Sequence, residues 1–304
     1  MDFINSLPGT LAQGLTWGIM AIGVYITYKI LDLADLTVDG SLVTGACVAA
    51  VLVISGVNVW LAMLIAFIAG MLAGLVTGLL HTLLGIPAIL SGILTQLILW
   101  SINLKILGKA NVGVSARTYS VAITQLNKGG AILTLVIFCI AIIAVLYYFF
   151  GTEFGSSLRA TGNNPNMSKA QGINTNLTKV IGLMLANGFV ALAGSLLMQY
   201  QGAADINMGR GAIVIGLAAI IIGDAIFGKI SRNFAFKLAT VVLGGVVYYL
   251  VYQVIVFIGI DTDLLKMLSA VVVACFLAIP YLRKKIIKPK FKLPKSEVNS
   301  DVRD

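Results

Sequence analysis

The most conspicuous candidate for chemistry is a glycine-bounded run that matches part of a phosphate-binding loop. Gly223-Asp-Ala-Ile-Phe-Gly228-Lys229 fits the first seven positions of G-x-x-x-x-G-K-[ST], in which backbone N–H groups cradle phosphates. The eighth position is Ile230, so the hydroxyl that binds Mg²⁺ is missing, and the preceding run 213–222 is a hydrophobic span rather than a strand. We therefore predict a helix end here. If ATP drives this protein, another chain binds it.

Other residues that carry catalysis are few and scattered. His81 is the only histidine, which excludes a His-based metal cluster or triad, and we expect it to end a helix. Cys47, Cys139 and Cys275 lie in apolar runs without paired spacing, as small core residues do. No pair of carboxylates converges in the pattern, which disfavours an enzyme acting on lipid. We predict no catalytic residue, metal or cofactor.

The remaining candidates are polar side chains within or beside long apolar runs. Such residues are expensive in a bilayer and often mark a transport path. They equally serve as hydrogen-bonding partners between helices, so both readings stay open for each residue. The wider set also contains Thr95, Asn103, Asn187 and Gln201. The candidate path residues are Asp35, Asp39, Gln96, Gln199, Asp205 and Asn207, of which the last three cluster at the end of one span.

Composition places the elements that carry these residues in a membrane. Of 304 residues, 59% are apolar and 11% charged, whereas soluble domains average roughly 45–50% and about 25%. A helix needs about 20 apolar residues to cross a bilayer, so roughly 180 apolar residues fill about nine crossings. This excludes a soluble enzyme, a disordered chain and a nucleic-acid-binding module. We predict an all-α, polytopic transmembrane helical bundle of about nine spans (8–10).

Hydrophobic runs locate the predicted spans. The run 40–55 is short and follows three aspartates, so it is either a full crossing or part of a broken helix. Gly40 to Gly45 and Gly211 to Gly216 repeat one spacing, and each opens a group of three spans of opposite direction, as in inverted-repeat transporters. The predicted spans are 11–31, 40–55, 59–80, 86–104, 131–150, 177–200, 211–228, 235–258 and 264–282.

Basic residues indicate the orientation. The net charge is +9, and eight basic residues lie in the tail 283–304, which favours a cytoplasmic anchor touching anionic lipids over a nucleic-acid site. With this tail inside, fifteen Lys and Arg residues are cytoplasmic and six are not. Residues 1–10 contain no Lys or Arg, so no cleaved signal is expected. The side of the N-terminus stays open, because the run 40–55 decides it.

Glycines predict where helices approach closely. Gly70, Gly74 and Gly78 recur every fourth residue and share one face of the span 59–80. Small residues allow this contact where lipid supplies no hydrophobic drive between helices. Packing within the chain is favoured over a seam between two copies.

The most informative polar segment is 155–173. Asn164 suits a helix N-cap, Pro165 the first helical position, and Gly172 the residue after the helix. The intervening residues make about two turns, too short a helix to be stable alone in water. It therefore docks either in a partner's groove or on its own bundle.

This segment carries a resemblance to a known family. Leu158-Arg-Ala-Thr-Gly-Asn-Asn-Pro165, followed by Ala170-Gln-Gly-Ile-Asn174, resembles the cytoplasmic coupling loop of ABC importer permeases of the branched-chain amino acid and ribose type. Downstream, Asn207-Met-Gly209 and the Ala-rich, Gly-ended run 211–223 look like the same family's pattern. Gly223-Asp224 departs from it, since family members often have a second glycine there.

The resemblance implies a type II ABC importer-like permease domain over 1–282, in a prokaryotic plasma membrane with a cytoplasmic C-terminus. Its loop 151–176 would transmit ATPase closure to the membrane helices. The implied partners are cytoplasmic ABC ATPase subunits, an extracytoplasmic solute-binding protein and a second permease copy, identical or paralogous. The implied solute is an amino acid, aromatic or branched-chain, ahead of a sugar or nucleoside. The implied coupling residues are Arg159, Ala160, Gly162, Asn163, Asn164, Pro165, Met167, Ala170, Gly172 and Ile173.

One rival remains from the residues alone. An ion-coupled secondary transporter would use Asp35, Asp39 or Asp205 as an ion or proton site. Uptake that follows an ion gradient without ATPase partners would favour it.

Overall fold

The computed structural model describes residues 3–228 and 233–258, together with positions 267, 270, 271, 274 and 278. The predicted tail 283–304 and most of the predicted span 264–282 lie outside these residues. The helices are α1 (Phe3–Tyr25), η1 (Ile26–Ile30), α2 (Thr37–Ile54), α3 (Val59–Thr82), α4 (Ala88–Leu107), α5 (Lys128–Gly151), α6 (Glu153–Asn163), α7 (Pro165–Ala170), α8 (Thr175–Gln201), α9 (Ala212–Phe227) and α10 (Phe234–Phe257), and the strands are β1 (Asn111–Gly113) and β2 (Ala203–Asp205).

The helical bundle confirms the predicted all-α membrane fold, but not the count of about nine spans. Within the described residues, seven helices are long and apolar enough to cross a membrane. The predicted span 211–228 is the shorter α9, whose 16 residues rise about 24 Å, less than the roughly 30 Å of a bilayer core. His81 lies in the last turn of α3, as expected, with Nδ1 2.8 Å from the Ile86 carbonyl oxygen.

The irregular backbone lies before the run 40–55 rather than within it. Residues 37–54 form one continuous helix, α2, so the reading of that run as a broken element is wrong. The interruption precedes α2, where α1 widens into the π-helix η1 and residues 31–36 are not helical. Asp32 there has φ 54°, a left-handed conformation unusual for a residue with a Cβ.

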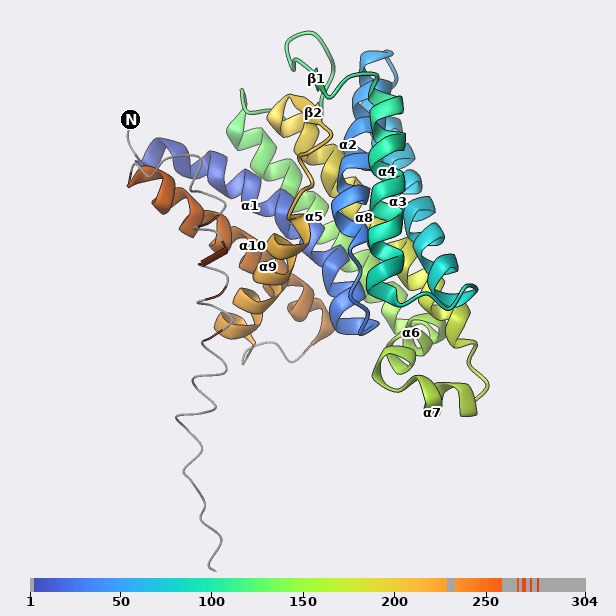
Figure 1. Ribbon diagram of the computed structural model, residues 1–304. Helices are drawn as coiled ribbons and strands as arrows, with labels where there is room; N and C mark the ends of the chain where they lie inside the picture. The colour runs from blue at the N-terminus through green and yellow to red at the C-terminus, as the bar shows by residue number, and fades with distance from the viewer. Residues whose placement is uncertain are drawn as a thin grey trace, which may run out of the picture.

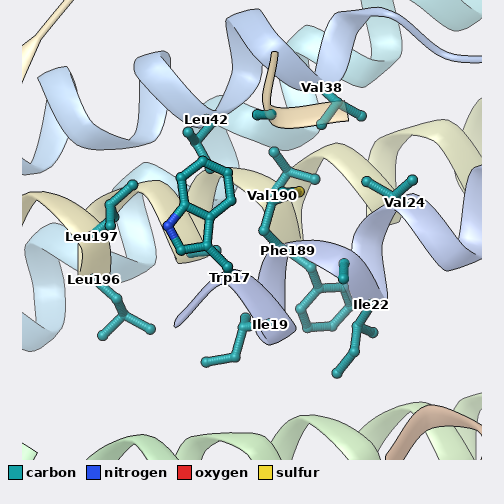
Figure 2. Close-up of a cluster of buried hydrophobic side chains, with 14 of the residues drawn as sticks. Trp17, Ile19, Ile22, Val24, Val38, Leu42, Phe189, Val190, Leu196 and Leu197 are labelled. Carbon is teal, nitrogen blue, oxygen red and sulfur yellow. The ribbon is translucent and has the colours of Figure 1, made fainter. Parts of the chain in front are cut away.

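Helix α8 is the centre of the bundle. Most of its residues are buried, and α1, α2 and α3 pack around it. Figure 2 shows this core, in which Trp17 of α1 and Leu42 of α2 lie beside Val190 and Leu197 of α8.

Glycines bring α8 and its neighbours to backbone contact. A Cβ at Gly70 or Gly74 of α3 would collide with carbonyl oxygens of α8, and one at Gly78 would meet the Val180 backbone. A Cβ at Gly45 of α2 would strike the Ala191 carbonyl oxygen. The glycine face of α3 thus packs within the chain, as lipid-embedded helices require close van der Waals contact to associate.

The two ends of the bundle differ. At one end β1 and β2 pair as an antiparallel two-stranded sheet, with Val112 opposite Ala204. At the other end α6 and α7 project from the bundle (Figure 1). The connections at the two ends therefore offer different surfaces to partners.

The α3–α8 contact yields a test of this packing. Gly74→Leu should destabilise the protein by about 3 kcal/mol, because the backbones must separate to admit the side chain. Val76→Leu, on the exposed face of the same helix, should have little effect. Thermal unfolding in detergent, followed by fluorescence-detected gel filtration, measures both, and equal midpoints would contradict the contact.

Candidate functional site

The projecting helix α7 is built by local capping signals. Asn164 accepts a hydrogen bond from the Met167 N–H at 3.1 Å, and Pro165 occupies the first turn. Gly172, with φ 83°, closes the far end in a conformation that favours glycine. The predicted short helix is therefore present, and capping residues fix both of its ends.

Helix α6 was not anticipated, because its stretch of sequence looked like a polar loop. Its N-cap is Thr152, whose hydroxyl accepts from the Gly155 N–H at 3.3 Å. Leu158 and Thr161 are buried against the bundle, and the Thr161 hydroxyl lies 3.0 Å from that of Thr178 on α8. Tertiary packing on one face makes this segment helical despite its glycines and serines.

One glycine connects α6 to the irregular end of α1. A Cβ on Gly162 would collide with the Ile30 carbonyl oxygen, so α6 touches the backbone of η1 directly. A displacement of α6 is therefore passed to η1 and α1 without a compliant side chain between them.

Arg159 points back into the bundle rather than toward a partner. Its Nη2 donates to the Phe150 carbonyl oxygen at 2.5 Å, and its guanidinium lies 5.6 Å from the centre of the Phe234 ring. The phenylalanine comes from α10, so Arg159 fastens α6 to both α5 and α10. Among the predicted coupling residues, Arg159 is therefore the one that holds α6 against the bundle.

The outer surface of α7 is open. Met167 is 59% exposed, and Lys169 and Ala170 are also exposed. Ser168 faces inward and is buried, while Ile173 is half-buried. Of the predicted coupling residues, the exposed ones are Arg159, Asn163, Asn164, Pro165, Met167, Ala170 and Gly172, and Ala160, Gly162 and Ile173 are half-buried.

A second polar centre lies where α2 and α9 begin. The start of α2 runs beside the middle of α4, since a Cβ on Gly40 would approach Gln96 and Leu99. Asp39, in the first turn of α2, accepts hydrogen bonds from the N–H groups of Gly211 and Ile213, each at 2.9 Å. This carboxylate caps α9 from another helix. Both helices thus begin inside the bundle, at one joint.

Asp35 belongs to a buried network beside that joint. Its carboxylate accepts from the Thr37 N–H at 2.9 Å and from the Asn187 side chain of α8 at 2.7 Å. Asn187 in turn accepts from Ser41 at 2.6 Å, and Thr37 lies 2.7 Å from Thr77 of α3. Together these bonds tie α2 to α3 and α8. In the sequence Asn187 is one of ten polar candidates, and no pattern singles out Ser41.

Gln199, Asp205 and Asn207 stabilise the connections at the sheet end. The Gln199 side chain accepts from the Ala122 N–H at 2.8 Å, and the Asp205 carboxylate accepts from the Asn207 N–H at 2.7 Å and from Asn111 at 3.1 Å. The structure does not join these three to Asp35 in one cluster. Gln96, by contrast, lines a cavity that also contains Asp39 and Arg210.

The phosphate-loop look-alike behaves as expected where it is described. Helix α9 runs through Gly223 and ends at Phe227, and a Cβ on Gly223 would collide with the Thr240 carbonyl oxygen of α10. Its glycine serves helix packing. Lys229 and Ile230 lie outside the described residues.

The Asp39 cap can be tested directly. Asp39→Ala leaves two N–H groups of α9 without their acceptor and should destabilise the protein by about 2 kcal/mol. Asp39→Asn keeps one side-chain oxygen and should recover part of this loss. Amide hydrogen exchange at residues 211–213, with thermal unfolding alongside, measures both variants, and unchanged protection in Asp39→Ala would contradict the cap.

A family model and a curated relative match this chain along nearly its whole length. A family model described as the branched-chain amino acid transport system permease component matches residues 6–277. A tyrosine transport system permease protein of Clostridioides difficile (strain R20291) is 37% identical over 300 residues, 98% of this chain and 100% of the relative. A xylose transport system permease protein of Haemophilus influenzae is 35% identical over 88 residues, only 28% of this chain and 24% of the relative.

A solved structure shares the fold. PsaBC from Streptococcus pneumoniae in complex with Fab has a TM-score of 0.52, with 16% identity, over 94% of this chain and 96% of that chain. At this identity the likeness concerns the fold alone. The family match and the full-length relative carry the assignment: the chain belongs to the branched-chain amino acid transport system permease family and is an inner-membrane permease subunit of an ABC importer.

Proposed function

We propose that this subunit forms half of the path for an amino acid and that cytoplasmic ATPases drive it through α7. The observation that carries the coupling role is the capped α7 with exposed Met167, held on the bundle by α6. A short helix with fixed ends and an open face suits the groove of a partner, since its conformation is set before binding. A second permease copy, ATPases and an extracytoplasmic binding protein complete the importer.

The contacts of α6 give this coupling a physical route. Force on α7 reaches α6, which is braced by Arg159 on Phe150 and abuts Ile30 through Gly162. Ile30 ends η1, and a π-helical turn is a common site of adjustment within a helix. ATP binding then favours one arrangement of the membrane helices by stabilising the closed ATPases. In this proposal α7 and the C-terminal tail lie on the cytoplasmic side.

The aspartates support this energy source over an ion gradient. Asp35 accepts hydrogen bonds from Thr37 and Asn187, and Asp39 caps α9. Asp205 holds a turn at the sheet end. Each of these three carboxylates accepts hydrogen bonds that hold the fold, and this structural role favours ATP over an ion gradient as the energy source.

An amino acid is the substrate class that we favour. The relative that is similar over its entire length is a tyrosine permease, whereas the similarity to the xylose permease covers 28% of this chain. A match over the full length includes every segment that lines the path, whereas a match over 28% of the chain covers at most part of them. Tyrosine is therefore the first solute to test.

The docking role of α7 predicts a selective loss of assembly. Met167→Glu places a charge on the exposed face of α7 and should abolish co-purification of the ATPase subunits. Leu126→Glu alters a residue of similar exposure, 66%, outside α6 and α7, and should leave assembly unchanged. Affinity purification from cells expressing the complete importer measures both. Equal recovery of the ATPases would sink the docking role.

The substrate class predicts a preference in transport. Proteoliposomes containing the complete importer should accumulate L-tyrosine when ATP is enclosed with the ATPases, and unlabelled xylose should not compete. Without ATP, an imposed proton or sodium gradient should drive no uptake. Accumulation of xylose but not of tyrosine, or uptake driven by a gradient alone, would contradict this proposal.

A further inference from the structure

A small cavity beside the α2–α9 joint gathers charged, polar and aromatic groups at membrane depth. Its volume is about 150 Å³, and it lies between α2, α4 and the segment that precedes α9. Asp39 and Arg210 bring opposite charges to its wall, Gln96 and Asn103 bring amides, and Trp100 brings an indole. Gln96 lies about 16 Å from the end of α4 at Leu107, at 1.5 Å per residue, so the cavity is well inside the bundle's length.

Several of these groups are incompletely paired. Asn103 is 1% exposed, yet its side-chain oxygen has no hydrogen-bond partner among the described residues, and its nitrogen is 3.5 Å from the Gly40 carbonyl oxygen. Within the residues that the structure describes, the Arg210 side chain makes no ion pair and no hydrogen bond. Asp39 receives one bond at each oxygen, which leaves further acceptor positions on both. Unpaired polar groups at such depth indicate a ligand.

We infer that this cavity binds the head group of an α-amino acid during its passage, an inference that rests on the proposed function. The Arg210 guanidinium takes the α-carboxylate through paired N–H donors. The α-ammonium donates to Asp39 and to the free oxygen of Asn103, which are both acceptors. The site thus recognises the α-carboxylate and α-ammonium groups, which all α-amino acids share.

The size and opening of the cavity fit this division. A cavity of about 150 Å³ holds a molecule the size of benzene, which suffices for the head group but not for the whole of tyrosine. The side chain then extends past Trp100, which is 43% exposed and offers an aromatic surface. A sugar carries no formal charge and would leave Arg210 unpaired. Recognition by Arg210 therefore favours amino acids over sugars.

The exposed position of the site indicates what closes it. Arg210 and Leu97 are exposed at the mouth of the cavity, and a lipid chain could not pair a guanidinium. The facing permease copy would supply the opposite wall, so the path runs between the two copies. Two such half-sites, one on each copy, then receive the solute in turn.

The test is uptake of L-tyrosine by the complete importer in proteoliposomes, at saturating liganded binding protein, so that the rate reports steps after delivery. Arg210→Gln should lower the maximal rate about tenfold, the loss expected for a charge-assisted bond to a carboxylate. Arg210→Lys, which keeps the charge without the planar fork, should retain an intermediate rate. The matched control is Arg117→Gln, which alters an exposed arginine of the β1–α5 connection, outside the cavity, and it should transport like the wild type.

Assembly with the ATPases is checked for each variant. Gln96→Leu is a second variant in the cavity wall and should also lower the rate of tyrosine uptake. Equal tyrosine rates for the wild type, Arg210→Gln and Gln96→Leu would overturn the inference while leaving the proposed function intact. Uptake of xylose and not tyrosine by the wild type would overturn both. A tenfold loss in Arg210→Gln, a smaller loss in Arg210→Lys and a wild-type rate in Arg117→Gln support the site.

Discussion

Backbone N–H groups inside a bilayer must find acceptors within the protein, and the Asp39 carboxylate meets that requirement at the start of α9. Without it, the N–H groups of Gly211 and Ile213, at the start of this 16-residue helix, would lose their acceptor. The same joint brings α2 beside α9 and leaves room for the cavity lined by Gln96 and Arg210. The interhelical cap and the candidate solute site therefore share one residue, Asp39.

The rest of the bundle provides a rigid frame around that joint. Gly45 and Gly74 allow α2 and α3 to lie against the α8 backbone, while Asn187 links Asp35 and Ser41 across the same contact. Close-packed elements move as units rather than deforming continuously. In the proposed coupling, a push on α6 at Gly162 would reach the end of α1 as a displacement of the whole helix.

Local signals in the sequence were sufficient for the ends of α7 and the apolar spans. Asn164, Pro165 and Gly172 each act within three residues of the backbone they cap, so their types alone specify the helix. The short run 40–55 beside three aspartates left a full crossing and a broken helix open, and the structure shows a continuous α2 with the irregular backbone before it.

Long-range pairing explains what the sequence could not provide. Asp39 bonds to residues more than 170 positions away, and nothing in the local pattern distinguishes such a cap from a path residue. Helix α6 depends on packing against α8 and η1 rather than on its own propensity. Arg210 looked like one more non-cytoplasmic cation until the fold placed it beside Asp39 and Asn103.

The central claim, that the exposed face of α4 at the cavity borders an aqueous path between two permease copies, can be tested by cysteine labelling. In a background with Cys47, Cys139 and Cys275 replaced by alanine, Leu97→Cys (64% exposed) is compared with Ile140→Cys on the apolar face of α5 (62% exposed). Thiols react as thiolates, which form in water and not in lipid. For the complete importer in nanodiscs, the account predicts that a charged methanethiosulfonate modifies Leu97→Cys much faster than Ile140→Cys. Equally slow modification of both would contradict it.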